Sequence, residues 1–176
     1  VTAMDDCGNL SAPMFFDVEV LPFTEVTVTV ELVGVRVGPV SRCIYFVGGD
    51  CSDTHSETLV FTDHDANLLT PVQATATFDV ACGPNATLCA KDEQHTLWGS
   101  TTLSAAGTTF VGDTIISLEG GDTDNDGDCD ANDVSWYLFQ FGTLDSPGGC
   151  PWDGVTRDAD FSDNGAVSTG DYAFLV

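Results

Sequence analysis

The stretch EVTVTVEL, residues 25–32, alternates apolar and polar side chains without a break. The apolar positions fall on one side of an extended chain: Val26, Val28, Val30 and Leu32. Successive side chains of a β-strand point to opposite faces, so this period of two predicts a strand with one buried face. The stretch ATATFDV, residues 74–80, repeats the pattern. The fold is therefore expected to be built from half-buried strands.

Further strands are predicted on both sides of these two, separated by Gly, Pro, Asn and Asp. They are FFDVEVL (15–21), RCIYFV (42–47), ETLVFT (57–62), HTLWGSTTL (95–103) and TTFVGDTIISL (108–118). About seven short strands at this spacing indicate a mainly β domain over residues 1–118, with the architecture of an immunoglobulin-like antiparallel β-sandwich. The Cys–Trp–Cys arrangement of antibody domains is not evident in the sequence.

The composition changes at Glu119-Gly120-Gly121, where the alternating pattern stops and acidic, Gly-rich and Pro-rich segments begin. We place a domain boundary here, so that residues 119–176 form a second, smaller domain. No long linker separates the two parts, and we expect them to pack together.

The charge of the chain limits its partners. Acidic residues number 28 against 4 basic ones, which gives a formal net charge of −24. Nucleic acids and anionic membranes need Lys and Arg, so neither is an expected partner, whereas cations are. No apolar run is long enough to span a membrane. The opening VTAMDD lacks the pattern of an export signal, and we interpret it as the start of a mature, exported chain.

The seven cysteines favour an extracellular protein. Their short spacings suggest three local disulfides, although spacing alone does not fix connectivity. The suggested pairs are Cys43–Cys51, Cys82–Cys89 and Cys129–Cys150, which leaves Cys7 over. Reduced thiols in a cytosolic protein are the alternative, and zinc is less favoured because no CxxC pair occurs. Two glycosylation sequons begin at Asn9 and Asn85 and agree with secretion.

The stretch DTDNDGDCDAND, residues 122–133, holds six aspartates in twelve positions. They occupy positions 1, 3, 5, 7, 9 and 12, with Gly127 at position 6: Asp122, Asp124, Asp126, Asp128, Asp130 and Asp133. An EF-hand loop supplies calcium ligands from these same positions and needs glycine at position 6 for its sharp turn. Position 7 contributes a backbone carbonyl, so the Asp128 side chain is not required.

A second copy follows at DFSDNGAVSTGD, residues 160–171. Its expected ligands are Asp160, Ser162, Asn164, the Ala166 carbonyl, Ser168 and Asp171, with Gly165 at position 6. Two side-chain carboxylates replace five, so this site is expected to be the weaker one. The alternative is a pair of acidic, turn-rich linkers, which the tandem repeat of Gly at position 6 and Asp at position 12 disfavours.

Apolar residues follow each loop and predict short helices. After the first loop the main apolar face is Val134, Tyr137, Leu138 and Phe141, and Gly142 is a suitable helix end. Trp136 and Phe139 lie off this face. We expect this second face to pack on the β-domain, in preference to binding a partner.

Paired loops with Asp at position 12, each followed but not preceded by a helix, resemble type I dockerin repeats. The resemblance covers about residues 120–176 and implies two Ca²⁺ ions, a compact pair of loop–helix units (F-hands), and docking onto a protein partner such as a cohesin domain. The β-domain followed by GGDTDND and RDADFSDNGAVSTGDYAF is similar to secreted dockerin-repeat proteins of environmental bacteria without assigned enzyme activity.

Several features depart from the cellulosomal pattern. Positions 10 and 11 are unlike in the two loops, Ala131-Asn132 and Thr169-Gly170, although they help to choose the cohesin in that family. The connection GTLDSPGGCPWDGVTRDA is long, and position 8 of the first loop is Cys129. These departures weaken the expectation of cohesin binding but leave that of calcium intact.

No catalytic constellation is evident. Glu19, Glu25 and Glu31 lie on predicted strands, where solubilising roles are commoner than catalysis. The stretch DTHSETLVFTDHD, residues 53–65, holds acids and histidines without a recognised metal-binding spacing. The chain is therefore not expected to be an enzyme.

The leading hypothesis is an extracellular, calcium-binding structural protein that assembles with copies of itself into a surface fibre or layer. The alternative is a carbohydrate-binding module anchored to a cohesin-type scaffold through its dockerin. A small hydrolase is the least favoured function.

Overall fold

A computed structural model of the chain describes 23–36, 38–48, 53–63, 70–81, 83–92, 94, 97–144, 159–162 and 164–175. The predicted strand at 15–21, the sequon at Asn9 and the leftover Cys7 lie outside these residues. Within them the protein is mainly β, with one short α-helix.

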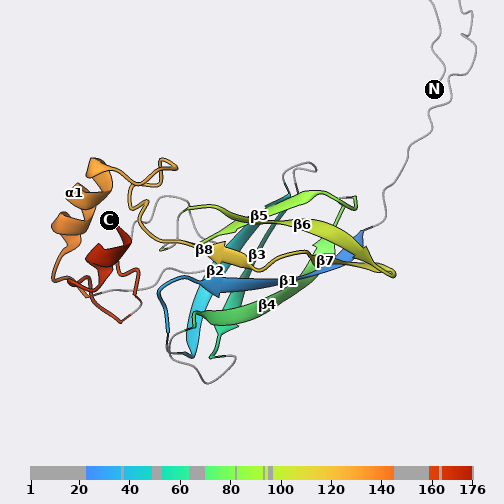
Figure 1. Cartoon of the computed structure of the whole chain (residues 1–176), viewed down its shortest axis with the longest axis horizontal. Helices are drawn as coiled ribbons and strands as arrows, with labels where there is room; N and C mark the ends of the chain where they lie inside the picture. The colour runs from blue at the N-terminus through green and yellow to red at the C-terminus, as the bar shows by residue number, and fades with distance from the viewer. Residues whose placement is uncertain are drawn as a thin grey trace, which may run out of the picture.

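Eight strands precede the helix (Figure 1). They are β1 (Thr24–Leu32), β2 (Val40–Gly48), β3 (Thr54–Phe61), β4 (Val72–Val80), β5 (Thr87–Lys91), β6 (Gly99–Ala106), β7 (Thr109–Gly112) and β8 (Ile116–Leu118). Two helical elements follow them, α1 (Ala131–Gln140) and the 3₁₀ helix η1 (Asp171–Phe174). Figure 1 shows both helical elements beyond one end of the strands.

The two strictly alternating segments form the longest ladder of the sheet. Strands β1 and β4 pair antiparallel from Thr24 opposite Val80 to Leu32 opposite Val72. The apolar side chains of β1 are at most 1% exposed, as the sequence pattern predicts: Val26, Val28, Val30 and Leu32. Burying these branched side chains stabilises the fold, by about 1.5–3 kcal/mol for each fully buried side chain.

The strands form one nearly closed sheet in the order β3-β2-β5-β6-β7-β1-β4, with β8 also on β1. Strand β6 pairs with β5 on one side and with β7 on the other. Strand β1 lies parallel to β7 and β8, unlike the wholly antiparallel arrangement expected. A two-sheet sandwich is therefore not confirmed, because the strand path is continuous through β6.

Two strand predictions differ from the structure. Strand β5 is not among the predicted strands; it lies between β2 and β6, and its Leu88 and Ala90 side chains are buried. The single strand expected at 108–118 is interrupted after Gly112. At this glycine a Cβ would lie 3.0 Å from a side-chain carbon of Thr101. Strand β7 ends here, and β8 then pairs with a later part of β1.

The described residues form two hydrophobic clusters. The larger lies within the strands, and the smaller holds Tyr137, Ala159, Phe161, Val167 and Leu175, packed with Val134 and Phe174. The predicted boundary near residue 118 falls between them in the sequence and stays a prediction.

The two clusters meet at two glycines. Gly34, which follows β1 with φ +94°, lies under the Phe174 ring so closely that a Cβ would sit 2.0 Å from its Cζ. A Cβ on Gly120 would lie 2.7 Å from the Phe161 ring. The aromatic side chains of the C-terminal part therefore pack directly on backbone that continues from the sheet.

The cysteines differ in state. Cys43 is disulfide-bonded, and its expected partner Cys51 lies outside the described residues. Cys89 and Cys129 are free thiols, so the bridges expected for them, to Cys82 and Cys150, are not formed in this structure. Both expected partners lie outside the described part of the chain. Cys89 is half-buried in β5, and burial raises the pKa of its thiol. Cys129 lies at the surface, where partial desolvation and the nearby carboxylates raise the pKa of its thiol. The sequon residue Asn85 is exposed, with φ 66°.

Candidate metal centre

The first acidic loop is held by its two buried carboxylates. Asp122 accepts hydrogen bonds from the backbone N–H groups of Asp126 at 3.0 Å and Gly127 at 2.9 Å. Asp133 accepts from the N–H groups of Asp124 at 3.1 Å and Asp130 at 2.6 Å. The carboxylates at positions 1 and 12 thus hold the loop closed through backbone hydrogen bonds, and both residues are 0% exposed.

The second loop repeats this pattern position by position. Asp160 accepts from the N–H groups of Asn164 at 3.1 Å and Gly165 at 2.7 Å. Asp171 accepts from the N–H groups of Ser162 and Ser168, each at 2.8 Å. Both acids are again 0% exposed. The correspondence predicted from spacing therefore extends to the hydrogen bonds that close each loop.

The position-5 side chains also correspond. Asp126 Oδ1 accepts from the Asp128 N–H at 3.2 Å, and Asn164 Oδ1 accepts from the Ala166 N–H at 3.2 Å. Position 6 has a positive φ in both loops, +99° at Gly127 and +88° at Gly165, a conformation that glycine adopts without steric cost. Each loop therefore turns at the position that the sequence indicated.

The first loop brings its carboxylates together in two groups whose ligand atoms lie within 4.8 Å of one another: Asp122, Asp124 and Asp126, and Asp128, Asp130 and Asp133. Burial raises the pKa of Asp122, and the nearby Asp133 raises it further. The neighbouring Asp126 raises the pKa of the exposed Asp128. A divalent cation would relieve this repulsion.

The donor set fits a hard cation such as Ca²⁺. An ionised carboxylate has about four lone-pair sites. Asp122 and Asp133 accept backbone N–H groups with some of these sites, and a carboxylate can do so while it also binds a cation. Ca²⁺ takes six to eight oxygens, and carboxylates, hydroxyls and carbonyls of this kind are its usual ligands. The second loop offers the same positions with fewer charges, from Asp160, Ser162, Asn164, Ala166, Ser168 and Asp171.

Helix α1 is capped by residues of the first loop. Asp130 is the N-cap residue and accepts from the Asn132 N–H at 2.6 Å, while Asp133 completes a capping box. The second loop ends in the shorter η1, whose N-cap residue, Gly170, has no side chain that could cap it. Asp133 therefore serves both structures, because it holds the first loop and completes the cap of α1.

Helix α1 also links the two loops. The Tyr137 hydroxyl donates to the Ser168 carbonyl at 2.8 Å, and Gln140 Oε1 accepts from the Ala159 N–H at 2.9 Å. Just after α1, backbone hydrogen bonds join Gly142 and Thr143 to Val167, at position 8 of the second loop. The two loops are thus parts of one packed unit.

Lys91, at the end of β5, was not singled out in the sequence, yet it contacts the first loop. Its Nζ donates to Asn125 Oδ1 at 2.7 Å and lies 4.7 Å from the centre of the Trp98 ring. Burial lowers the pKa of Lys91, and Asp122 raises it in opposition. The signal that could have revealed it is the scarcity of basic residues, since only four occur in the chain.

The outer surface of α1 and the turn after it is apolar. Four of its side chains are 49–84% exposed: Leu138, Phe139, Phe141 and Leu144. We name these, together with Trp136 and Tyr172, the α1 surface; the last two are 37% and 45% exposed. Trp136 and Phe139 pack edge to face at 6.0 Å. The expectation that Trp136 and Phe139 pack on the β-domain is wrong for Phe139, which is 80% exposed.

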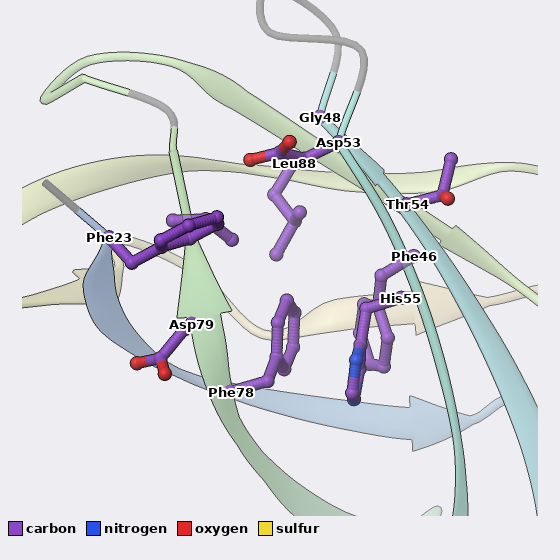
Figure 2. Close-up of a pocket in the computed structure, with 10 residues that line it drawn as sticks. Phe23, Phe46, Gly48, Asp53, Thr54, His55, Phe78, Asp79 and Leu88 are labelled. Carbon is purple, nitrogen blue, oxygen red and sulfur yellow. The ribbon is translucent and has the colours of Figure 1, made fainter. Parts of the chain in front are cut away.

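The acids and histidines at 53–65 do not form a metal cluster among the residues that the structure describes, and His64 and Asp65 lie outside them. His55 instead stacks on Phe78 at 4.3 Å, inside a small cavity between β3 and β4 (Figure 2). Asp53 accepts a hydrogen bond from the Ala81 N–H.

Comparison of the chain with protein-family models, with curated proteins and with solved structures finds no match. Among the described residues, no helix is long and apolar enough to cross a membrane. The interpretation of the site therefore rests on its own geometry.

Proposed function

We propose that the protein is an extracellular, calcium-binding structural subunit that assembles with copies of itself into a fibre or layer. The observation that carries this proposal is the α1 surface, an apolar surface beside two paired acidic loops. Large clustered apolar side chains on a protein surface usually mark a contact with another molecule.

Two Ca²⁺ ions, one in each loop, are the cofactors of this proposal. The repeated hydrogen bonds to Asp122 and Asp133, and to Asp160 and Asp171, support it. The ions would stabilise the C-terminal unit that presents the α1 surface, because an ion bound only by the folded form favours that form. In this interpretation the unit is a dockerin-like pair of F-hands, and the protein has no enzymatic activity of its own.

Calcium would also reduce the repulsion between copies. The chain carries a formal charge of −24, and like charges oppose close approach of two subunits. Each bound Ca²⁺ removes two negative charges at the end of the molecule that bears the α1 surface. Assembly and calcium binding are therefore expected to favour each other.

Negative-stain electron microscopy of the purified chain, with millimolar calcium and again after EGTA, tests the proposal. We expect fibres or sheets in calcium that shorten or fray on chelation, while magnesium at the same concentration supports them less well. Dispersed monomers in calcium at high protein concentration would contradict self-assembly.

The second candidate function is a carbohydrate-binding module attached through its dockerin-like unit to a cohesin-like partner. Trp98 favours it, because its ring is 46% exposed beside a groove of about 450 Å³ that Ser117 and Glu119 also line. An aromatic ring beside a few polar groups is the usual lining of such a site. Retention on polysaccharide columns that is lost in Trp98→Ala would support this function.

A further inference from the structure

The sheet is left open between β3 and β4. At one end of this gap, Thr62 and Gln73 exchange backbone hydrogen bonds of 2.9 and 3.0 Å. At the other end the side chain of Asp53 accepts from the Ala81 N–H. Between these ends, no backbone hydrogen bond joins the two strands over the described residues. The gap is therefore closed at its ends and lacks a ladder along its length.

The backbone groups that face this gap follow from the Thr62–Gln73 pair. Both the N–H and the C=O of each of these residues point across the gap, and the direction alternates along a strand. The backbone N–H and C=O groups of alternate residues therefore also point into the gap. These residues are Ser56, Thr58 and Val60 on β3, and Thr75, Thr77 and Asp79 on β4. Two strand edges with unpaired groups thus face each other, an arrangement suited to an added strand.

The inner side of the gap combines apolar and polar side chains. A cavity of about 90 Å³ lies at the Asp53 end of the gap, and the polar residues Asp53, Thr54, His55 and Asp79 are part of its lining. Its apolar lining comes from β2, β4 and β5 and from the residue before β1: Phe23, Phe46, Phe78, Val80 and Leu88. In Figure 2, His55 and Phe78 extend into it from β3 and β4. Glu57, the next inward-facing residue on β3, lies 3.6 Å from His55 Nε2. A strand placed here would bury apolar side chains on its inner face.

The segment MFFDVEVL, residues 14–21, has the pattern of such a strand. Phe16, Val18 and Val20 alternate with Asp17 and Glu19. It lies outside the described residues and precedes Phe23, whose side chain lines the cavity. With its apolar residues inward, the two acids would point outward, level with exposed threonine hydroxyls of β3 and β4. We propose that the β3–β4 gap receives this segment of a second copy as an added strand, a partner assignment that rests on the proposed self-assembly.

A second copy fits better than the segment's own chain. Strand β1 begins at Thr24, paired with Val80, on the edge of β4 away from the gap. From the gap to β1 is two strand spacings, about 9.6 Å. The three residue steps from Leu21 to Thr24 span at most about 10 Å. The segment of the same chain would therefore have to cross β4 fully stretched, whereas the segment of a neighbour has no such constraint.

This contact would join unlike surfaces of two copies, a segment on one and a gap on the next. Such a head-to-tail contact repeats along a line and builds a fibre when its rotation does not close a ring. Each subunit would complete the sheet of its neighbour.

Matched substitutions in the full chain test the proposal. Val18→Lys places a charge on the inward face of the segment, and Glu19→Lys places the same side chain on the outward face. We expect Val18→Lys to reduce fibre mass in calcium at least tenfold, and Glu19→Lys to leave fibres. A synthetic peptide of residues 14–21 added to wild-type chain should shorten fibres, while a scrambled peptide should not. Circular dichroism checks that both variants fold.

The outcomes separate this contact from self-assembly itself. Fibres that persist in Val18→Lys and with the peptide would overturn the strand assignment and leave self-assembly standing. A lowered melting temperature of Val18→Lys at dilutions where the chain is monomeric would show that each chain fills its own gap, and would also overturn it. If the wild type forms no fibres, NMR shifts at 54–60 and 75–79 on adding peptide would still support the gap as a strand site, and their absence would refute it.

Discussion

Asp122 shows how much of the site depends on single side chains. It is 0% exposed, accepts hydrogen bonds from the backbone N–H groups of Asp126 and Gly127, and lies within reach of the Asp124 and Asp126 carboxylates. Its role at position 1 could be predicted from spacing because glycine and carboxylates recur at fixed positions in both loops. The contact of Lys91 with Asn125 could not be predicted, because the two residues are 34 positions apart and no local pattern encodes such a pairing.

Asp122→Asn is expected to weaken calcium binding to the first loop at least tenfold, about 1.4 kcal/mol. The substitution removes a buried negative charge while keeping an oxygen and nearly the same shape. Calorimetric titration with calcium measures the effect. Asp128→Asn, at position 7 with its side chain exposed, is the control and should change affinity much less. Equal losses in the two variants would contradict the assigned ligand roles.

Gly34→Ala is expected to destabilise the chain by about 2–4 kcal/mol. The new Cβ would overlap the Phe174 ring, and overpacking of this kind costs about 1–3 kcal/mol. The positive φ of +94° adds about 1 kcal/mol.

Gly107→Ala is the matched control for that substitution. Gly107 also has a positive φ, +71°, but no atom lies within 4 Å of its Cβ position. The difference between the two variants in urea unfolding therefore isolates the contact with Phe174. Equal destabilisation would mean that the C-terminal part does not rest on this turn.

Among the elements, those with regular alternation were predicted well and short ones were not. Strands β1 and β4 follow their alternating residues, and their register buries the apolar set. Strand β5 has five residues in a segment rich in Cys, Gly and Pro, so its strand character comes from the neighbours on both sides. The parallel pairing of β1 with β7 and β8 depends on the whole chain path, which local patterns do not contain.

The two loop–helix elements are expected to fill with calcium in order. The first loop has aspartate at positions 3, 5 and 9, where the second has Ser162, Asn164 and Ser168. More ligand charge raises calcium affinity. A titration followed by NMR should show signals of the first loop shifting at lower calcium than those of the second. Simultaneous filling, or the reverse order, would contradict this ranking.

Lys91→Met is expected to loosen the contact between β5 and the first loop while raising calcium affinity. The substitution removes the hydrogen bond to Asn125 and a positive charge that favours ionised Asp122 without an ion. Calorimetry should show tighter calcium binding, by a few-fold, and thermal unfolding in EGTA should occur at a lower temperature. Unchanged calcium affinity would show that the ammonium and the ion do not compete.

At the scale of the whole molecule, charge is expected to control assembly. Copies that each carry a formal charge of −24 repel one another, and salt screens this repulsion over about 8–10 Å at physiological ionic strength. Light scattering should therefore detect larger assemblies as sodium chloride rises at fixed calcium. Dissociation by moderate salt would mean that attraction between charges, and not the apolar surfaces, holds the copies together.

The α1 surface makes a separate prediction about the assembled state. Phe139→Ser should leave the melting temperature of the isolated chain nearly unchanged, because the side chain is 80% exposed. It should also reduce the amount of assembled material seen by sedimentation in calcium. Tyr137→Ser, on the buried side of the same helix, should instead lower the melting temperature. Full assembly of Phe139→Ser would remove the α1 surface from the contact.

The parallel pairing of β1 with β8 matters for a molecule under mechanical tension. Val30 lies opposite Ile116 and Leu32 opposite Leu118, and β8 leads directly toward the C-terminal unit. A force that pulls the start of β1 away from the end of β8 slides the two strands along each other. The hydrogen bonds of this contact are then loaded together and not one after another, so they share the load. The domain is thus arranged to resist stretching along its own chain.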